Sequence, residues 1–339
     1  MRNFLYDSRF LKPTTFDDIK TICIGNLCAG GAGKTPHTEY ILKLLGREYK
    51  TASLSRGYGR KTSGYREVLE DSIPEDCGDE PLQIKRKFAE TFVAVSENRV
   101  KGVKKIKEQN ANTDAIVLDD AFQHRQIKCG LTILLTEFDN PFYEDSMLPG
   151  GRLRESAHGY LRADMIVVTK TPEYATAIDL KRVMKEINPR PYQNMYFSYL
   201  RYGALFGMFD KTDIIHPPQK LFRYKVLLLT GIANPGTILT YVKEYADGVQ
   251  HKRYPDHHNF TPAEITEIIR DFNALEDKNK IIITTEKDAI RLQTYTAQLK
   301  DLPIFVLPVE VDFKSKAEEF NDKIVSYVTR NKIYHRKYS

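Results

Sequence analysis

Short runs of apolar residues recur along the chain, and each is followed by a turn signal and then by a stretch with helical periodicity. Within the runs, apolar and polar residues do not alternate, which is typical of parallel strands buried on both faces of a sheet. This rhythm predicts repeated strand–turn–helix units and hence an α/β fold. The predicted strands lie in TICIGN, TASLSRG, TFVAVSE, AIVLDD, LTILLTE and MIVVTK, and later in KVLLLTG, KIIITTEKD and PIFVLP.

A stretch rich in aromatic residues and prolines interrupts this rhythm between residues 191 and 224. Its partly alternating pattern predicts an antiparallel β connector. A chain of 339 residues also exceeds one ordinary domain. We therefore expect a larger N-terminal domain over residues 1–190, the connector, and a smaller C-terminal α/β domain over residues 225–330. The last helix can return to the first domain, and the final nine residues are expected to fray.

Composition and charge narrow the class of protein. The chain is 41% hydrophobic and 28% charged, as in soluble globular proteins. Its net charge of +6, from 51 basic and 45 acidic residues, favours an anionic partner, but no block of like charges indicates nucleic-acid binding. The four cysteines show no metal-site or disulfide spacing, so we expect reduced thiols in a cytoplasmic protein. No apolar run approaches the roughly 18 residues of a membrane-spanning helix.

The first 16 residues, MRNFLYDSRFLKPTTF, mix apolar and basic side chains. Such a segment can lie on an anionic bilayer surface. It can equally pack on its own domain, and the sequence leaves both interpretations open.

The first predicted strand leads into ICIGNLCAGGAGKTPHTEYILKLL, residues 22–45. Its glycines and G-K-T fit the phosphate-binding pattern G-x-x-x-x-G-K-[ST], although Cys28 stands where that pattern begins with glycine. Backbone N–H groups of such a loop converge on phosphate at a helix N-terminus, while the lysine and the hydroxyl serve the phosphates and Mg²⁺. A structural glycine turn is the alternative. The predicted nucleotide-binding residues here are Asn26, Gly30, Gly31, Ala32, Gly33, Lys34, Thr35 and Pro36.

A second motif, AIVLDDAFQHR, places Asp119 and Asp120 at the carboxyl end of a predicted strand. Open α/β sheets bind their ligands at that edge, and a P-loop protein needs a carboxylate there for magnesium. Gln123 and His124 follow within one helical turn. A polar strand-end turn is the alternative, but beside a P-loop the motif favours a metal site.

The segment LPGGRLRE follows a Gly-Gly turn, so its charged residues are expected on a loop. Arg152 and Arg154 suit phosphate oxygens through bidentate geometry, and Glu155 can help to hold the metal. A solvated loop is the alternative. The predicted magnesium-binding residues are therefore Thr35, Asp119, Asp120, Gln123, His124 and Glu155.

Three further motifs allow a structural and a catalytic interpretation. Asp79 and the following proline in GDEP are typical of a helix start with an aspartate N-cap. His257 follows an aspartate in PDHHNF, and such a pair can act as an acid–base element or simply be exposed. In TTEKD, Thr285 and Asp288 predict a helix cap. No N-K-x-D motif follows a later strand, so GTP specificity is unsupported.

Nine motifs stand in series from about residue 20 to residue 310: GNLCAGGAGKTP, SRGYGR, GDEP, LDDAFQHR, LPGGRLRE, RAD, TGIANP, PDHHNF and TEKDAIRL. With them the chain resembles the tetraacyldisaccharide 4′-kinase family, the lipid A kinases of Gram-negative bacteria. That family also carries a residue other than glycine at the position of Cys28. The resemblance therefore favours a divergent P-loop over a structural turn.

The resemblance implies transfer of the γ-phosphate of ATP to the 4′-hydroxyl of tetraacyldisaccharide 1-phosphate, by a peripheral protein at the cytoplasmic face of the inner membrane. It implies that Asp79 is the general base, that His257 is its partner and that Lys34 holds the phosphates. No nucleic acid and no obligate protein partner are expected. For Mg²⁺ it implies Thr35, Asp120 and Glu155, with Asp119, Gln123 and His124 close by.

Two other functions share parts of this pattern. A P-loop switch or assembly ATPase that acts on a protein partner would have the loop and the aspartate pair, but it would need neither Asp79 nor His257. A soluble small-molecule kinase would have the same loop and a polar acceptor.

Overall fold

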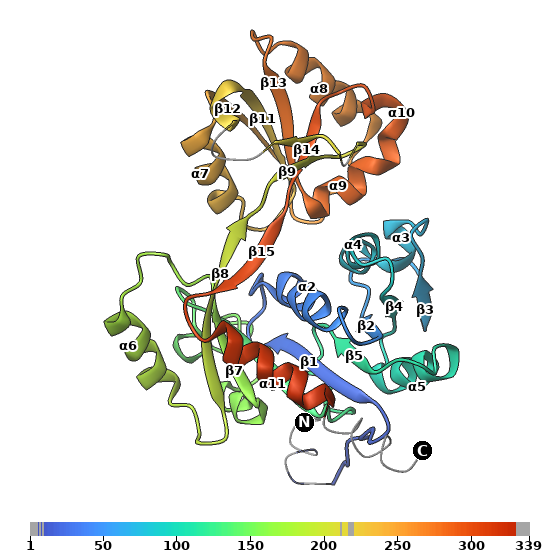
Figure 1. Ribbon diagram of the computed structural model, residues 1–339, viewed down its shortest axis with the longest axis vertical. Coiled ribbons are helices and arrows are strands. Elements are labelled where there is room, and N and C mark those ends of the chain that lie inside the picture. Colours follow the sequence, from blue (N-terminus) through green and yellow to red (C-terminus); the bar gives the residue numbers. More distant parts are fainter. Residues whose placement is uncertain (1–5, 7, 9, 211, 216–219, 330–339) are drawn as a thin grey trace. The chain divides into compact units, whose positions relative to one another are not determined.

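The computed structural model describes residues 6, 8, 10–210, 212–215 and 220–329 of the chain (Figure 1). It divides into two compact units. The first comprises Met1–Leu200 and Val311–Ser339, and the second comprises Arg201–Glu310. Each unit has its own sheet, and each is described separately below.

The first unit is built on a nine-stranded sheet in the order β15-β8-β7-β6-β1-β5-β2-β4-β3. From β8 to β4, neighbouring strands are parallel, whereas β3 runs antiparallel to β4 at one edge. The central strands are almost fully buried, as the apolar runs predict. The strands are β1 (Lys20–Asn26), β2 (Thr51–Ser55), β3 (Arg66–Val68), β4 (Phe92–Val95), β5 (Ala115–Leu118), β6 (Leu131–Glu137), β7 (Met165–Thr169), β8 (Asn194–Tyr202) and β15 (Val309–Phe313).

Helices cover this sheet and complete its core. The last helix of the described chain returns to the first unit, where the ring of Phe320 lies 6.0 Å from that of Tyr40 on α2. Figure 1 shows this helix running beside α2 over the strands. The helices of the unit are α2 (Lys34–Leu45), α3 (Pro74–Cys77), α4 (Asp79–Lys87), α5 (Arg99–Gln109), α6 (Ala177–Ile187) and α11 (Ala317–Thr329).

The second unit has a six-stranded sheet in the order β10-β9-β14-β13-β11-β12. Strands β12, β11, β13 and β14 are parallel, and β9 runs antiparallel to β14 and β10. The strands are β9 (Leu205–Gly207), β10 (Ile214–Ile215), β11 (Lys225–Thr230), β12 (Gly248–Arg253), β13 (Lys280–Thr285) and β14 (Ile304–Leu307). The helices are α7 (Gly236–Tyr245), α8 (Pro262–Asn273), α9 (Glu286–Leu292) and α10 (Thr296–Leu299).

The α/β class and all nine strands predicted from apolar runs are confirmed. The units divide at other residues than expected, because β8 pairs in parallel with β7 and so belongs to the first sheet. Strands β9 and β10, also expected in the connector, belong to the second sheet. The antiparallel character expected for the connector is found in β9 and β10. Strand β8 is parallel to β7 on one side, but its other neighbour is β15. There Lys314 N–H donates to the Phe197 carbonyl and Gly203 N–H donates to the Pro308 carbonyl, an antiparallel register.

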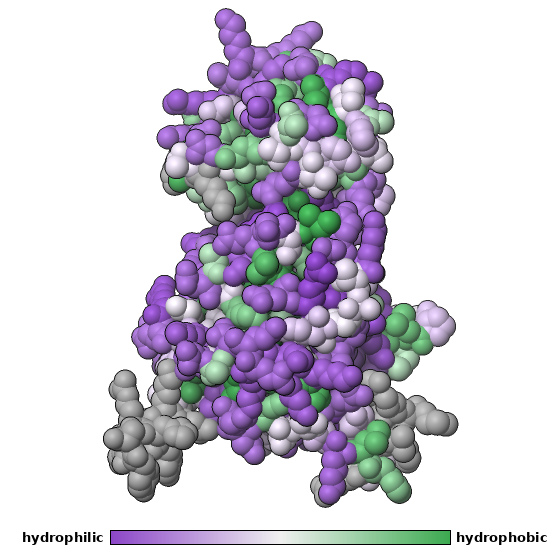
Figure 2. All heavy atoms as spheres, turned by 90° about the vertical axis from the view of Figure 1, so that its right-hand side faces the viewer, coloured by the Kyte–Doolittle hydropathy of each residue, from purple (hydrophilic) through white to green (hydrophobic). Residues whose placement is uncertain are grey.

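The described part of the N-terminal segment packs partly on its own unit. Arg125 lies over the ring of Tyr6 at 5.4 Å, Thr14 forms a bridge with Ile127, and Phe10 is 82% exposed. Residues 1–5, 7 and 9, and the last nine residues expected to fray, lie outside the described residues. No helix within the described ranges is long and apolar enough to cross a membrane. The face in Figure 2 is mostly hydrophilic, with apolar side chains in small groups.

Candidate active site

The predicted phosphate-binding loop connects β1 to α2, and Asn26 and Lys34 form its two ends. Asn26 donates a hydrogen bond to the carbonyl of Cys28 at 2.6 Å and accepts one from the Lys34 ammonium at 3.3 Å. Gly33 precedes the helix with φ = 79°, a left-handed conformation that favours glycine. The loop therefore ends at a helix N-terminus whose free N–H groups can bind an anion.

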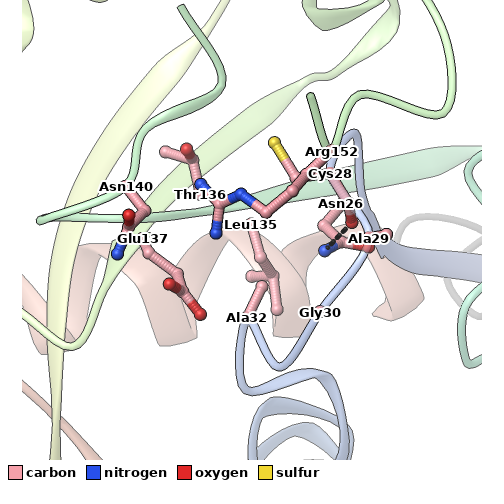
Figure 3. A pocket seen from close by; sticks show the side chains of 10 residues that line it. All are labelled: Asn26, Cys28, Ala29, Gly30, Ala32, Leu135, Thr136, Glu137, Asn140 and Arg152. Atoms are coloured by element: carbon pink, nitrogen blue, oxygen red, sulfur yellow. Dashed lines mark hydrogen bonds between the residues drawn. The ribbon is translucent and has the colours of Figure 1, made fainter. Parts of the chain in front are cut away.

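Cys28 can replace the usual opening glycine because its backbone is not left-handed. It forms an antiparallel bridge with Leu153, a pairing that uses extended backbone open to any residue. The bridge is flanked by hydrogen bonds from Ala29 N–H to the Arg152 carbonyl (2.6 Å) and from Arg154 N–H to the Leu27 carbonyl (2.9 Å). The LPGGRLRE segment thus supports the outer side of the loop. Figure 3 shows a small pocket at this side, lined by the loop, by the end of β6 and by Arg152.

The two arginines of that segment make different contacts. Arg152 pairs with Asp145 at 2.8 Å, whereas Arg154 pairs with Asp120 at 3.1 Å. Lys34 also lies 3.7 Å from Asp120. The predicted phosphate and metal residues Lys34, Asp120 and Arg154 are therefore brought together.

Asp119 and Asp120 follow β5 directly, and the backbone of Asp120 is left-handed with φ = 46°. Left-handed backbone is unusual for a residue with a side chain and is common at functional sites. Burial, together with the nearby carboxylates of Glu80 and Asp120, raises the pKa of Asp119 to about 7. Although burial also raises the pKa of Asp120, Lys34 and Arg154 hold it below its usual value.

Glu155 is only 5% exposed and is held inside this edge of the unit. Both its carboxylate oxygens accept hydrogen bonds from Arg162 at 2.9 Å. Gln123 donates to Glu155 at 3.1 Å and to the Asn26 carbonyl at 2.7 Å. It therefore connects the LDDAFQHR and LPGGRLRE motifs to the P-loop. The backbone N–H of His124 donates to the Ala121 carbonyl at 2.9 Å.

Asp79 is the first residue of α4 and is 9% exposed. The predicted N-cap role is wrong, because Gly78 (φ = 90°) occupies the N-cap position. The SRGYGR loop packs backbone to backbone on this turn: a Cβ on Gly78 would lie 2.8 Å from the Tyr58 carbonyl, and one on Gly57 would lie 2.7 Å from the Cys77 carbonyl. Glu80 of the GDEP motif is near enough to Asp119 for its negative charge to help raise the pKa of Asp119.

Three residues of this site were not predicted from the sequence as site residues: Glu80, Arg99 and Arg162. Arg99 is 2% exposed and donates to the backbone carbonyls of Ser96 (2.5 Å) and Asp119 (3.2 Å), and burial lowers its pKa to about 10. Arg99 begins α5 four residues after β4 ends, and a charged residue at the start of a helix that follows a predicted strand is its sequence signal. Glu80 and Arg162 lie within quoted motifs, so their motifs were found but not their contacts.

His257 lies in the second unit, in the loop after β12, and its backbone is left-handed with φ = 56°. Arg291 donates to its Nδ1 at 3.2 Å. Arg291 also pairs with Asp288 at 3.3 Å, and both side chains are almost fully buried. The predicted cap is confirmed, since the Thr285 hydroxyl accepts from the Asp288 N–H at 3.1 Å. His258 instead contacts Glu264 through Nε2 at 2.9 Å.

A glycine-rich loop at the carboxyl edge of a parallel sheet, with a lysine directed at a strand-end aspartate, defines a P-loop nucleotide-binding protein. Comparison with known proteins identifies which kind. A profile of the family "Tetraacyldisaccharide-1-P 4′-kinase" (LpxK) matches residues 1–329, and the chain belongs to this family. The prediction from the nine motifs is thereby confirmed.

Individual relatives agree with this assignment. A tetraacyldisaccharide 4′-kinase from Bacteroides thetaiotaomicron is 42% identical to this chain, over 98% of this chain and 90% of its own length. One from Flavobacterium johnsoniae is 37% identical over 98% and 93% of the two chains. A crystal structure of LpxK from Aquifex aeolicus in complex with ATP has a TM-score of 0.72 and 27% identity, and the match covers 96% of this chain and 93% of that one.

Proposed function

We propose that this enzyme transfers the γ-phosphate of ATP to the 4′-hydroxyl of tetraacyldisaccharide 1-phosphate. Family membership supports the reaction, and the P-loop with Lys34 beside Asp120 is the observation that carries it. The similar LpxK from Aquifex aeolicus was crystallised in complex with ATP, which supports ATP as the donor here. In this reaction the 4′-oxygen bonds to the γ-phosphorus, ADP leaves and the hydroxyl proton passes to a base.

The P-loop would bind the phosphates through its backbone N–H groups. Lys34 and Arg154 already neutralise Asp120, and both can turn to phosphate oxygens when nucleotide binds. Lys34 would then stabilise the charge that develops on the transferred phosphoryl group. Arg152 remains a second candidate for a phosphate contact.

We propose Thr35, Asp120 and Glu155 as the residues that hold Mg²⁺, with Asp119, Gln123 and His124 close by. The fit rests on the donor set, because hydroxyl and carboxylate oxygens are ligands that magnesium prefers. Burial and the charges of Glu80 and Asp120 raise the pKa of Asp119, and a divalent cation would offset the negative charge there. Within the described ranges, no three acidic, histidine or cysteine side chains form a metal cage. Magnesium typically needs none, since it keeps waters and phosphate oxygens, and it would offset charge on the phosphates.

We propose Asp79 as the general base that accepts the 4′-hydroxyl proton. Its carboxyl group is buried at the start of α4, in the motif that also reaches the aspartate pair through Glu80. A carboxylate that is shielded from solvent at a helix start can accept a proton from a positioned group. His257 is proposed as its partner in the same step, and the motif resemblance supports that role.

The substrate carries four acyl chains, so we propose that the enzyme works at the cytoplasmic face of the inner membrane as a peripheral protein. Phe10 and Leu11 are exposed near the N-terminus and supply apolar contacts of the kind that an interfacial segment uses. No protein partner is required for the proposed reaction.

The test is transfer of ³²P from γ-labelled ATP to tetraacyldisaccharide 1-phosphate in detergent, with wild type, Asp79→Ala and Lys34→Ala compared. We expect labelled bis-phosphorylated lipid from wild type, a loss of about 10²-fold or more in kcat for Asp79→Ala, and almost no turnover for Lys34→Ala. ADP binding should survive in Asp79→Ala. ATP hydrolysis without labelled lipid would instead indicate the switch ATPase, and lost ADP binding would make Asp79 a nucleotide or metal residue.

A further inference from the structure

His37 lies in the first turns of α2 and is only 2% exposed, yet it has no role in the site described so far. Both of its ring nitrogens have partners. Nδ1 lies 2.7 Å from the carbonyl oxygen of Gly33, and Nε2 lies 2.9 Å from the hydroxyl of Ser198 on β8, 161 residues further along the chain. The imidazole therefore forms a buried connection between the P-loop and a distant strand.

The chemistry of the partners defines the form of the ring. A carbonyl oxygen can only accept, so Nδ1 must carry the hydrogen. In the neutral ring Nε2 then has a lone pair, and the Ser198 hydroxyl donates to it. Both polar atoms of the imidazole are thus satisfied without charge, as a buried group requires.

The carbonyl that His37 holds belongs to the last peptide of the P-loop. In a trans peptide the C=O and N–H point in opposite directions, so fixing the Gly33 carbonyl also fixes the Lys34 N–H. That N–H lies at the helix N-terminus, where an anion binds. Gly33 has φ = 79° and no side chain, and glycine backbone is conformationally free. The His37 backbone N–H also donates to the Gly33 carbonyl at 3.2 Å, so the shorter contact of the imidazole is a second hydrogen bond that fixes the same oxygen.

Ser198 gives this connection a firm support. It is 1% exposed, and its carbonyl accepts a hydrogen bond from the Thr171 N–H at 2.9 Å. The carbonyl of the neighbouring Phe197 accepts from the Lys314 N–H at 3.0 Å. The hydroxyl is therefore carried by backbone that is hydrogen-bonded on both sides.

We propose that His37, supported by Ser198, is a positioning residue for phosphate binding, because it orients the Gly33–Lys34 peptide toward the nucleotide. This inference rests on the proposed binding of ATP phosphates at the P-loop. It makes the His37 and Ser198 side chains part of the phosphotransfer machinery although neither touches the substrate.

The test compares Ser198→Ala, His37→Asn and His37→Leu with wild type in KM for ATP, kcat and the dissociation constant of ADP. Ser53→Ala, which removes a buried hydroxyl from β2 of the same sheet, is the matched control. Measurements are made well below the melting temperature of each variant. A lost neutral hydrogen bond typically corresponds to about 2- to 10-fold, so Ser198→Ala should raise KM and the ADP dissociation constant by that factor. The kcat of Ser198→Ala should change less, because the Gly33–Lys34 peptide binds the phosphates equally in the ground state and in the transition state.

His37→Leu should raise KM by about 10-fold or more, and His37→Asn should restore part of this loss because its amide N–H can replace Nδ1–H. If the variants lower only the melting temperature, and KM and ADP binding match Ser53→Ala, the inference is wrong. If His37→Leu does not fold, Ser198→Ala and His37→Asn provide the same test. Full activity of Lys34→Ala would overturn both this inference and the proposed function. If Lys34→Ala is inactive, but Ser198→Ala and His37→Asn keep the wild-type KM and ADP affinity, the inference alone is overturned.

Discussion

Asp119 and Asp120 are neighbours in the chain, but their surroundings shift the pKa values of their carboxyl groups in opposite directions. Burial and two nearby carboxylates raise the pKa of Asp119 to about 7, whereas Lys34 and Arg154 hold that of Asp120 low. Asp120 is therefore ionised at neutral pH, whereas the pKa of Asp119 lies close to neutral pH. A bound divalent cation would favour the ionised form of both.

The two adjacent histidines of the second unit give a prediction at the same scale. Arg291 donates to His257 Nδ1, so a neutral His257 ring carries its hydrogen on Nε2. His258 instead contacts Glu264 and stacks on Tyr254 at 4.9 Å, which are structural contacts. We expect His257→Ala to lower kcat by about 10-fold or more, and His258→Ala to lower the melting temperature by a few degrees with little change in kcat.

Steady-state kinetics and thermal melts of both variants check this ranking. The double variant His257→Ala with Asp79→Ala adds a second measurement. If both residues act in one step, the double variant should lose less kcat than the two single variants predict when their losses are combined. A larger loss of kcat in His258→Ala than in His257→Ala would show that the proposed role belongs to His258 and not to His257.

At the scale of elements, α2 has a buried titratable group whose effect on stability can be measured. Burial lowers the pKa of His37 to about 4 from an ordinary value of 6.5, and the hydrogen bond to Gly33 only partly offsets this. The folded protein therefore prefers the neutral ring. Its contribution to stability is complete above pH 6.5 and decreases as the pH falls toward 4, because the unfolded chain binds the proton first.

Denaturant unfolding of wild type and His37→Gln, in EDTA to remove metal, tests this dependence. Between about pH 7.5 and pH 5, the free energy of unfolding of wild type should fall by about 2 kcal/mol more than that of the variant. The opposite contribution of Asp119 is common to both proteins and cancels in the difference. Parallel pH curves for the two proteins would show that the ring is not held neutral.

Elements were predictable where local pattern determines them. Buried parallel strands leave apolar runs, and the cap at Thr285 follows from short-range hydrogen bonds. Strand β12 was not predicted, because as an edge strand with polar residues it leaves no apolar run. The boundary at residue 200 was also missed, because the pairing of β8 with β7 is a long-range contact that local composition does not reveal.

The candidate site shows the same limit. Motifs indicated the loop, the aspartate pair and the GDEP turn, because each uses residues close together in sequence. The contacts from Arg162 to Glu155, from Arg99 to the Asp119 carbonyl and from His37 to Ser198 join separate motifs. Such contacts depend on how elements pack, so they became visible only in the structure.

At the scale of the whole molecule, the chain leaves the first unit after Leu200 and re-enters it at Val311, on the neighbouring strands β8 and β15. Ser198 lies just before the first of these crossings, and its hydroxyl is bound to the P-loop through His37. Nucleotide binding and the stability of this crossing strand are therefore expected to be linked.

Hydrogen exchange with saturating ADP and Mg²⁺ tests this link. When bound phosphate orders the P-loop, His37 and Ser198 should stabilise β8 as well, and a gain near 1 kcal/mol would slow exchange of the amides around Ser198 by about fivefold in wild type. In Ser198→Ala, with ADP raised to equal occupancy, most of that added protection should be lost. The amides of β3, at the opposite edge of the same sheet, should behave alike in both proteins. Equal ADP-dependent protection of β8 in wild type and variant would show that the strand senses nucleotide by another route, and that His37 acts on the loop alone.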